Sequence, residues 1–446
     1  MTSISHLPIY NLRVVLKETG LRADVLRAWE RRYELPKPQR SAGGHRLYSD
    51  YDIATVKWLH ARQSEGLSIS RAADLWKELI TSGQDPLDRP STPSTIENRV
   101  ISLVEGRLEG LRSQWVKACL NFDAFKADDI VNQAFAQASV ESVCFEILQN
   151  GLQEIGNLWH QDTATVQQEH FATALALRRL ETLISAAPQP VRSKTILVGC
   201  PASEWHTFPV VLLTLMLRRR GLNVINLGAN IPLEHLDQTA AGIRPDLIVL
   251  AAQQLSTVAA LRSAAVLLKH SGIPLGYGGL IFNRITELRG HIPAVFLGEA
   301  LAGAVERIEQ LIAVPMPVLE GMKVDESWLE IAATYRARCP FIEARLIVLL
   351  KKVGLPDEYM AAVNAYFAQE LSAALELGNP GLIETDFDWL KKLLADRKIP
   401  VDSLVPYLQA YQQAVEMEMG AAGSRITEWI SSYLARTSNT INSMME

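Results

Sequence analysis

A short stretch in the first half of the chain gathers four side chains that can bind ligands or metals. Residues 158–170 read LWHQDTATVQQEH and contain Trp159, His160, Glu169 and His170. The chain of 446 residues has only nine histidines and nine tryptophans, so this concentration is unusual. Imidazoles ligate transition metals, a carboxylate accepts hydrogen bonds, and an indole packs against flat ligands. Taken singly, each residue also fits an ordinary role at a helix end or in a core.

A second group of polar residues and glycines follows apolar segments farther along the chain. Apolar segments at 196–199, 223–227, 246–252, 273–279 and 294–298 alternate with helical patterns, which predicts a doubly wound parallel sheet. Ligands of such sheets lie at the carboxyl ends of the strands. The side chains expected there are Glu204, His206, Ser256, Thr257, Gly276, Gly278 and Gly279. A lone loop histidine is more often a surface residue, but glycines at the same edge leave room for a large ligand.

The elements that precede these groups indicate a DNA-binding head. A helix at 12–17, a Gly-containing turn at 18–21 and a second, arginine-rich helix form a helix-turn-helix pattern. Pro36 and Pro38 then force extended chain, and residues 40–48 predict a hairpin with Gly43 and Gly44 at its turn. We assign Leu26 and Trp29 to the core of this head. The predicted DNA contacts are Arg22, Arg27, Arg31, Arg32, Arg40, His45, Arg46 and Tyr48.

Charge and composition divide the rest of the chain. Residues 1–80 hold thirteen Lys and Arg against nine Asp and Glu, a net of +4, while the whole chain carries −5. A basic head on an acidic body favours a polyanionic partner. Helical periodicity at 96–188 predicts a four-helix bundle, whose last helix begins at Thr165 with Gln168 completing a capping box. The predicted domains are 1–80, a linker at 81–95, the bundle at 96–188, the α/β domain at 189–313 and an all-α domain at 325–446.

Nothing in the sequence predicts a membrane or secreted protein. No apolar run reaches about 18 residues, and the first ten residues lack a signal pattern. The four cysteines show no CxxC spacing, so neither a disulfide framework nor a zinc site is indicated. We expect a cytoplasmic location.

Two of the predicted domains resemble known families. LRAWERRY followed by R-x-x-x-G-x-R-x-Y resembles the winged-helix head of the MerR transcription regulators, with Glu34 where that family usually has glycine. The sheet resembles the cobalamin-binding Rossmann domain of corrinoid enzymes. That resemblance makes His206 the lower axial cobalt ligand, oriented by Glu204, and makes Ser256, Thr257, Gly278 and Gly279 the lining of a channel for the cofactor's tail. Pro209 replaces the motif glycine, and proline there can open the following helix.

The order of domains and the pattern Trp-x9-Glu-His resemble the adenosylcobalamin-dependent photoreceptor repressors of the CarH and LitR type. The resemblance covers residues 8 to 312. It implies that Trp159 packs on the upper face of the corrin, Glu169 hydrogen-bonds the adenosyl ribose and His170 supports the pocket. His160 stands where the family's upper cobalt ligand stands after light. By the same resemblance, photolysis of the Co–C bond changes a dark dimer or tetramer and releases double-stranded operator DNA.

Two alternatives remain open beside this interpretation. A cobalamin-sensing repressor insensitive to light would share most of the motifs. A corrinoid methyl carrier would share the sheet, but no substrate barrel or catalytic partner domain accompanies it here, so we expect a regulator and not an enzyme.

The last 120 residues extend beyond the resemblance and carry six helical patterns. A dimerisation or regulatory role is one expectation for them, and a biliverdin pocket is another, lined by Trp328, Tyr335, Trp389, Tyr407 and Tyr411.

Overall fold

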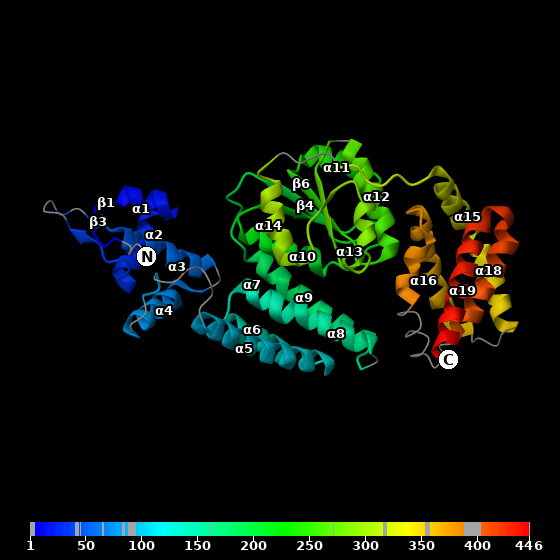
Figure 1. Ribbon diagram of the computed structural model, residues 1–446, viewed down its shortest axis with the longest axis horizontal. Coiled ribbons are helices and arrows are strands. Elements are labelled where there is room, and N and C mark those ends of the chain that lie inside the picture. The colour runs from blue at the N-terminus through cyan, green and yellow to red at the C-terminus, as the bar shows by residue number, and fades with distance from the viewer. Residues whose placement is uncertain are drawn as a thin grey trace. The chain divides into compact units, whose positions relative to one another are not determined.

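The chain forms two compact units in a computed structural model, one of residues 1–155 and one of residues 156–446 (Figure 1). The structure describes residues 5–40, 44, 46–64, 67–82, 85–87, 95–161, 163–270, 272–314, 319–352, 357–387 and 403–445. None of the helices in these ranges combines the length and the apolarity that a bilayer span requires.

The first unit begins with the predicted winged helix. Its elements are β1 Tyr10–Asn11, α1 Leu12–Thr19, α2 Ala23–Tyr33, β2 Gln39–Arg40, β3 Arg46–Tyr48, α3 Asp50–Ser64 and α4 Ile69–Thr81. The antiparallel strands lie in the order β1-β3-β2, with Arg40 opposite Arg46, which confirms the hairpin. Gly20 ends α1 in the left-handed conformation, with φ 71°, as the predicted turn requires. Leu26 and Trp29 are buried in the core of the head, as expected.

Glu34 ends α2 with the backbone geometry that glycine adopts most easily. Its φ of 59° and ψ of 33° are left-handed, and its N–H donates to the carbonyl of Glu30 at 3.1 Å. A residue with a side chain is strained in this region. The helix therefore ends with the backbone geometry that the family's glycine would supply, although the residue is different.

Helices fill the remainder of the first unit. They are α5 Thr95–Leu120, α6 Ala124–Phe135, α7 Val140–Val143, the π-helix η1 Cys144–Gln149 and the start of α8 Asn150–His160. Trp115 is buried at their centre, and a side chain at Gly151 would come within 2.8 Å of its ring. The helix α9 Val166–Ser185 belongs to the second unit. Because the predicted bundle is divided between the two units, its arrangement stays a prediction.

The second unit contains the predicted parallel sheet. Its strands are β4 Thr195–Gly199, β5 Asn223–Asn226, β6 Leu247–Ala251, β7 Leu275–Gly278 and β8 Val295–Phe296, in the order β5-β4-β6-β7-β8. All five residues of β6 are buried, as expected of a central strand covered on both faces. The helical elements of the sheet domain are α10 Phe208–Arg219, α11 Leu236–Ile243, α12 Leu255–His270, α13 Ile281–Arg284, the 3-10 helix η2 Thr286–His291 and α14 Leu301–Leu311.

The described residues after 325 form helices, and one of these differs from the sequence pattern. The described elements are α15 Glu326–Lys352, α16 Asp357–Glu376, the 3-10 helix η3 Pro380–Asp386, α18 Leu404–Met419, the 3-10 helix η5 Gly420–Gly423 and α19 Ser424–Met445. Two of the six helical patterns, at residues 326–339 and 343–354, lie on either side of Pro340, and the structure joins them in a single helix, α15. Proline removes one backbone hydrogen bond there, and the burial of Tyr335 and Ile342 on either side offsets that loss. The helical pattern at residues 386–398 lies almost wholly outside the described residues.

Candidate functional site

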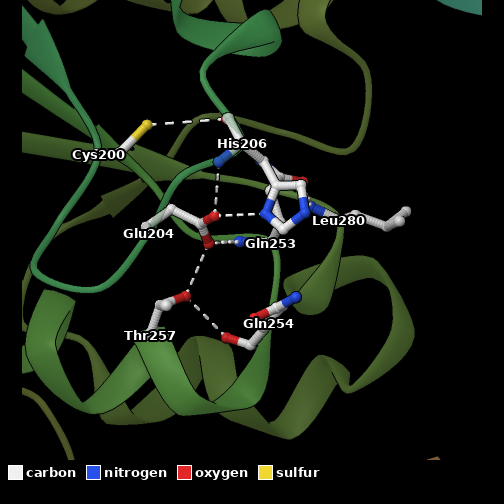
Figure 2. Close-up of polar contacts among 7 residues, drawn as sticks. All are labelled: Cys200, Glu204, His206, Gln253, Gln254, Thr257 and Leu280. Atoms are coloured by element: carbon white, nitrogen blue, oxygen red, sulfur yellow. Dashed lines mark hydrogen bonds and ion pairs between the residues drawn. The ribbon is translucent and has the colours of Figure 1, made fainter. Parts of the chain in front are cut away.

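His206 lies at the carboxyl edge of the parallel sheet, where the sequence places it, and Glu204 orients its ring. Nδ1 of His206 lies 2.6 Å from Oε1 of Glu204, and the backbone N–H of His206 donates to the same oxygen at 3.0 Å (Figure 2). The His206 side chain is 56% exposed, whereas that of Glu204 is 1% exposed. Because Nδ1 faces the carboxylate, Nε2 is the nitrogen left for a ligand.

The second oxygen of Glu204, Oε2, accepts hydrogen bonds from the segment after β6 and from α12. The backbone N–H of Gln253 donates to Oε2 at 2.7 Å, and the hydroxyl of Thr257 donates to it at 2.9 Å. Burial by itself would raise the pKa of Glu204, but the hydrogen bonds from His206 and Gln253 hold that pKa below its ordinary value. The same hydrogen bond raises the pKa of His206, against the effect of burial. The carboxylate is therefore charged, and it fixes the direction of the imidazole.

The loop between β4 and α10 is built by local contacts. Ser203 has φ 66°, and its N–H donates to Oδ1 of Asn230 at 2.8 Å. The N–H of Asn230 in turn donates to the carbonyl of Glu204 at 2.9 Å. Pro209 lies in the first turn of α10, where a missing N–H leaves no helix hydrogen bond unmade. The expectation that Pro209 opens this helix is confirmed.

Gly278, the last residue of β7, and Gly279, which follows it, differ in the space around them. Gly279 has φ +126°, and a Cβ there would lie 1.8 Å from the carbonyl oxygen of Ala252, so only glycine fits. A Cβ at Gly278 would meet no atom within 4 Å. The space that the sequence predicts for a ligand is therefore beside Gly278, while Gly279 serves the close approach of β7 to the end of β6.

The sequence predicts that Ser256 ends the third strand of the sheet, but Ser256 and its neighbour Thr257 lie in a helix. Strand β6 ends at Ala251, and both residues lie in the first turn of α12. Thr257 is buried and donates to Glu204, so its hydroxyl supports the carboxylate. The N–H of Ser256 donates to Glu370, a residue of the C-terminal domain, at 3.1 Å. The error arose because an apolar run does not show by itself where a strand gives way to a helix.

Two residues at this edge, Gln253 and Trp205, were not among the predicted site residues. Gln253 receives the backbone N–H of Leu280 on its side-chain oxygen at 2.9 Å, and its Nε2 is buried without a hydrogen-bond partner among the described residues. The Trp205 side chain is exposed beside His206. Leu227 and Leu280, which lie after β5 and β7 at the same edge of the sheet, are exposed as well. The sequence shows that Trp205 is next to His206, but only the structure shows that its side chain is exposed.

The corner that contains the other predicted residues has the expected helix ends. Trp159 and His160 end α8, and their ring centroids lie 4.8 Å apart. Helix α9 begins after Thr165, and the capping box with Gln168 is present. Glu169 accepts a hydrogen bond from the hydroxyl of Thr173 at 2.8 Å. These contacts confirm the helix–loop–helix corner between α8 and α9.

The charge of one residue of this corner, Glu169, affects the pKa of His206. The charge of Glu169 helps to raise the pKa of His206, after the larger effect of Glu204. Nε2 of His170 lies 3.7 Å from Oε2 of Glu169, with the His170 side chain exposed. Helix α9 also packs against α10, the helix that follows the His206 loop. Glu169 therefore lies on a helix that packs against the helix following the His206 loop.

The head exposes most of the predicted DNA-contacting arginines. Arg27, Arg31 and Arg32 are exposed on α2, and Arg40 is exposed on β2. Arg22 is exposed as well, with its guanidinium 3.1 Å from the carboxylate of Asp24. Exposed arginines on a recognition helix and on the strand beside a wing suit contacts with DNA phosphates. His45 lies outside the described residues.

Two predicted DNA contacts hold the head together instead. The side chain of Tyr48 is fully buried, and its hydroxyl donates to Oε1 of Glu30 at 2.6 Å. Burial and this hydrogen bond raise the pKa of Tyr48. Nε of Arg46 donates to Oε2 of Glu30 at 2.8 Å. The assignment of Tyr48 to DNA is therefore wrong, because its polar tip faces α2, and Arg46 is an ion-pair partner whose side chain is only partly exposed.

The aromatic residues of the C-terminal domain lie in its core. Tyr335, Tyr407 and Tyr411 are buried, and the hydroxyls of Tyr335 and Tyr411 hydrogen-bond each other. Trp328 packs against the same core, and Trp389 lies outside the described residues. This packing favours a structural role for the described aromatics, and the biliverdin pocket stays a prediction.

Comparison with known proteins identifies three regions of the chain. The family described as MerR HTH family regulatory protein matches residues 10–79. Two families described as B12 binding domain match residues 111–184 and residues 194–306. The matches cover the head, most of the predicted bundle and most of the sheet domain.

Two curated relatives match this chain along most of their own length. The chain is 29% identical over 329 residues to the HTH-type transcriptional repressor CarH of Myxococcus xanthus, covering 73% of this chain and 98% of that protein. It is 30% identical over 316 residues to the HTH-type transcriptional repressor CarA of the same organism, covering 68% and 95%. Among solved structures, the monomethylamine corrinoid protein of Methanosarcina barkeri matches 44% of this chain and 96% of its own, with 16% identity and a TM-score of 0.38.

Proposed function

The chain belongs to the family of MerR-type transcriptional regulators with B12-binding domains, and from that premise we propose that it uses adenosylcobalamin to regulate DNA binding in response to light. Family membership supports cobalamin-dependent DNA-binding regulation. The light response, the adenosyl form of the cofactor and the change of oligomeric state are the further steps of the proposal.

The observation that carries the proposal is the oriented imidazole of His206. A buried, charged carboxylate holds Nδ1 at 2.6 Å and leaves Nε2 available at an exposed position. A histidine ligand is usually oriented in this way, through a hydrogen bond at its other nitrogen. A macrocyclic cofactor already supplies most of the ligands of its metal, and Nε2 of His206 would supply one more from the protein.

The surrounding residues fit a large, flat and mostly apolar cofactor. Trp205, Leu227 and Leu280 expose apolar side chains at the carboxyl edge of the sheet, the edge that carries His206. The space beside Gly278 is open, and Nε2 of Gln253 is an orphaned donor at the same edge among the described residues. His206 would hold the cobalt from below, and Gln253 would donate a hydrogen bond to the cofactor's polar groups.

The corner at the end of α8 would cover the other side of the cofactor. When bound, adenosylcobalamin supplies a cobalt–carbon bond that visible light cleaves. Trp159 would pack against the adenosyl group and Glu169 would accept hydrogen bonds from its ribose, with His170 supporting the pocket. His160, whose ring lies beside that of Trp159, would present an imidazole to the same face after light. Movement of Trp159 and His160 would shift α8, a helix that is shared by both compact units.

DNA binding would depend on the number of heads that act together. Each head exposes a small set of arginines, so a single copy would bind an operator weakly. A dark dimer or tetramer would join several heads and gain avidity, which a light-induced dissociation would remove. We therefore propose a homo-oligomer that releases double-stranded operator DNA on illumination.

The test is an absorption spectrum of the chain loaded with adenosylcobalamin in the dark, recorded before and after green light, with size exclusion on both samples. We expect a stable photoproduct spectrum, altered by His160→Ala, together with a change in oligomer size. The matched control is His270→Ala, at the far end of α12, which should leave the photoproduct unchanged.

Other results would replace the proposal. A spectrum that bleaches like the free cofactor, with no change in size, would leave a light-insensitive cobalamin-sensing repressor. Transfer of a methyl group from methylcobalamin to a thiol acceptor would favour a corrinoid methyl carrier. A long-wavelength band in protein produced with biliverdin would locate a second chromophore.

A further inference from the structure

The C-terminal domain places a buried carboxylate at the first turn of α12. Glu370, on α16, is 1% exposed, and its Oε2 accepts the backbone N–H of Ser256 at 3.1 Å across 114 residues of sequence. The first N–H groups of a helix have no partner within the helix, and that end carries partial positive charge. A carboxylate from another domain therefore satisfies one of these donors and is stabilised there.

An apolar interface surrounds this hydrogen bond. Four residues of the C-terminal domain belong to the same buried core as the helices and strands of the sheet domain: Ala373, Ala374, Leu377 and Leu382. At the edge of the interface, Nδ2 of Asn379 donates to Oε1 of Glu287 on η2 at 3.1 Å. The C-terminal domain is thus docked on the sheet domain by a packed face, with Glu370 as its buried polar contact.

The turn that Glu370 holds is the turn that supports the proposed cobalt ligand. Ser256 is followed by Thr257, whose hydroxyl donates to Oε2 of Glu204 at 2.9 Å. Oε1 of Glu204 lies 2.6 Å from Nδ1 of His206. Only one residue of backbone and two hydrogen bonds therefore separate the contact with the C-terminal domain from the imidazole of His206. Figure 2 shows the two hydrogen bonds, from Thr257 to Glu204 and between Glu204 and His206.

We propose that Glu370 is a positioning residue for the His206 site, and that docking of the C-terminal domain couples that domain to cofactor binding. With α16 docked, the first turn of α12 is held where Thr257 reaches Glu204. When α16 separates, the turn loses its carboxylate and Glu204 loses part of its support. By linkage, a ligand bound at His206 strengthens the docking of α16 by the same factor. The identity of that ligand rests on the proposed function, but the contact itself does not.

The experiment compares amide hydrogen exchange of the full ligand-free chain in four forms: the natural sequence, Glu370→Gln, Glu370→Ala and Glu418→Gln. Glu370→Gln keeps the size and an acceptor but removes the charge, whereas Glu370→Ala removes both. Glu418 pairs with Arg345 within the C-terminal domain, so its variant controls for general loosening of that domain. We expect at least tenfold faster exchange at Ser256 and Thr257 in Glu370→Ala, a smaller increase in Glu370→Gln and none in Glu418→Gln.

A second readout separates a positioning role from a merely structural one. The N–H of His206, which donates to Glu204, should also exchange severalfold faster in Glu370→Ala. Faster exchange confined to Ser256 and Thr257 would show that Glu370 only caps the helix, and would overturn the proposal. Unchanged exchange at all three residues in both Glu370 variants would overturn it as well.

The holo form tests the coupling in the other direction. Adenosylcobalamin added in the dark should slow exchange in α16 of the natural sequence, and Glu370→Ala should bind it severalfold more weakly. If the natural sequence binds adenosylcobalamin without any effect on α16, the coupling is wrong while the cofactor assignment stands. If it binds no adenosylcobalamin, the proposed function fails, and exchange at His206 in the ligand-free chain still decides the role of Glu370.

Discussion

Oε1 of Glu204 accepts the backbone N–H of His206 and also lies 2.6 Å from its Nδ1, so a single buried oxygen sets both the position and the orientation of the imidazole. This arrangement makes Glu204 as necessary to the site as His206, and it gives the first two predictions.

Glu204→Gln should weaken adenosylcobalamin binding by about 10–100-fold, the usual effect of removing the carboxylate behind a ligating histidine. It should also lower the pKa of His206, because the charged hydrogen-bond partner that raises it is lost. Absorption titration in the dark measures the affinity, and NMR of the imidazole measures the pKa. Glu299→Gln, which changes an exposed carboxylate paired with Arg289, is the control. Equal affinity in the two variants would contradict the role of Glu204.

The stabilising effect of His206 in the ligand-free chain should depend on pH. A histidine whose folded pKa is raised above 6.5 contributes stability that is complete below 6.5 and is lost as the pH rises through the folded pKa. We therefore compare the free energies of unfolding of the natural sequence and His206→Gln at two pH values, about one unit below 6.5 and about two units above 6.5. The difference between the two proteins should be smaller at the higher pH. Urea unfolding at both pH values measures it.

Gly279→Ala should destabilise the sheet domain by about 2–4 kcal/mol, because backbone strain and a collision occur together. A Cβ at this position would lie 1.8 Å from the carbonyl oxygen of Ala252, at φ +126°. Gly278→Ala should cost less than about 1 kcal/mol, since its Cβ would enter open space. Thermal or urea unfolding compares the two variants. If the proposed cofactor space is correct, Gly278→Ala should still lower adenosylcobalamin affinity while the fold stays intact.

Arg31→Ala should weaken operator binding without affecting stability, because this arginine is exposed on α2. Removal of one side chain that binds a DNA phosphate should reduce the slope of log affinity against log salt by about one unit. Binding isotherms at several salt concentrations measure the slope. Arg307→Ala, on α14 of the sheet domain, should leave it unchanged. An unchanged slope in Arg31→Ala would remove this residue from the DNA interface.

Tyr48→Phe should lower the stability of the head by about 1–2 kcal/mol and leave the salt dependence of DNA binding unaltered. The buried hydroxyl donates to Glu30 at 2.6 Å, and phenylalanine cannot replace that bond. Thermal unfolding and salt-dependent DNA binding measure the two effects. Tyr33→Phe, on α2, serves as the matched control. A reduced salt slope in Tyr48→Phe would return Tyr48 to the DNA interface.

Local patterns in the sequence determined the elements and the main motif. Apolar runs marked all five strands of the sheet, and the capping box of Thr165 and Gln168 marked the start of α9. The pair Glu204 and His206 was recognisable because the two residues are only two positions apart. Such features depend on periodicity and on contacts within a few residues, which a single sequence contains.

Tertiary structure alone decided which distant groups meet. Thr257 supports Glu204 across 53 residues, Glu370 reaches Ser256 across 114, and Tyr48 turns inward to Glu30. Pro340 continues a helix that local rules would end, because core burial on both sides outweighs one missing hydrogen bond. Each outcome was set by desolvation and by the pairing of buried polar groups, which depend on partners that the neighbouring residues do not specify.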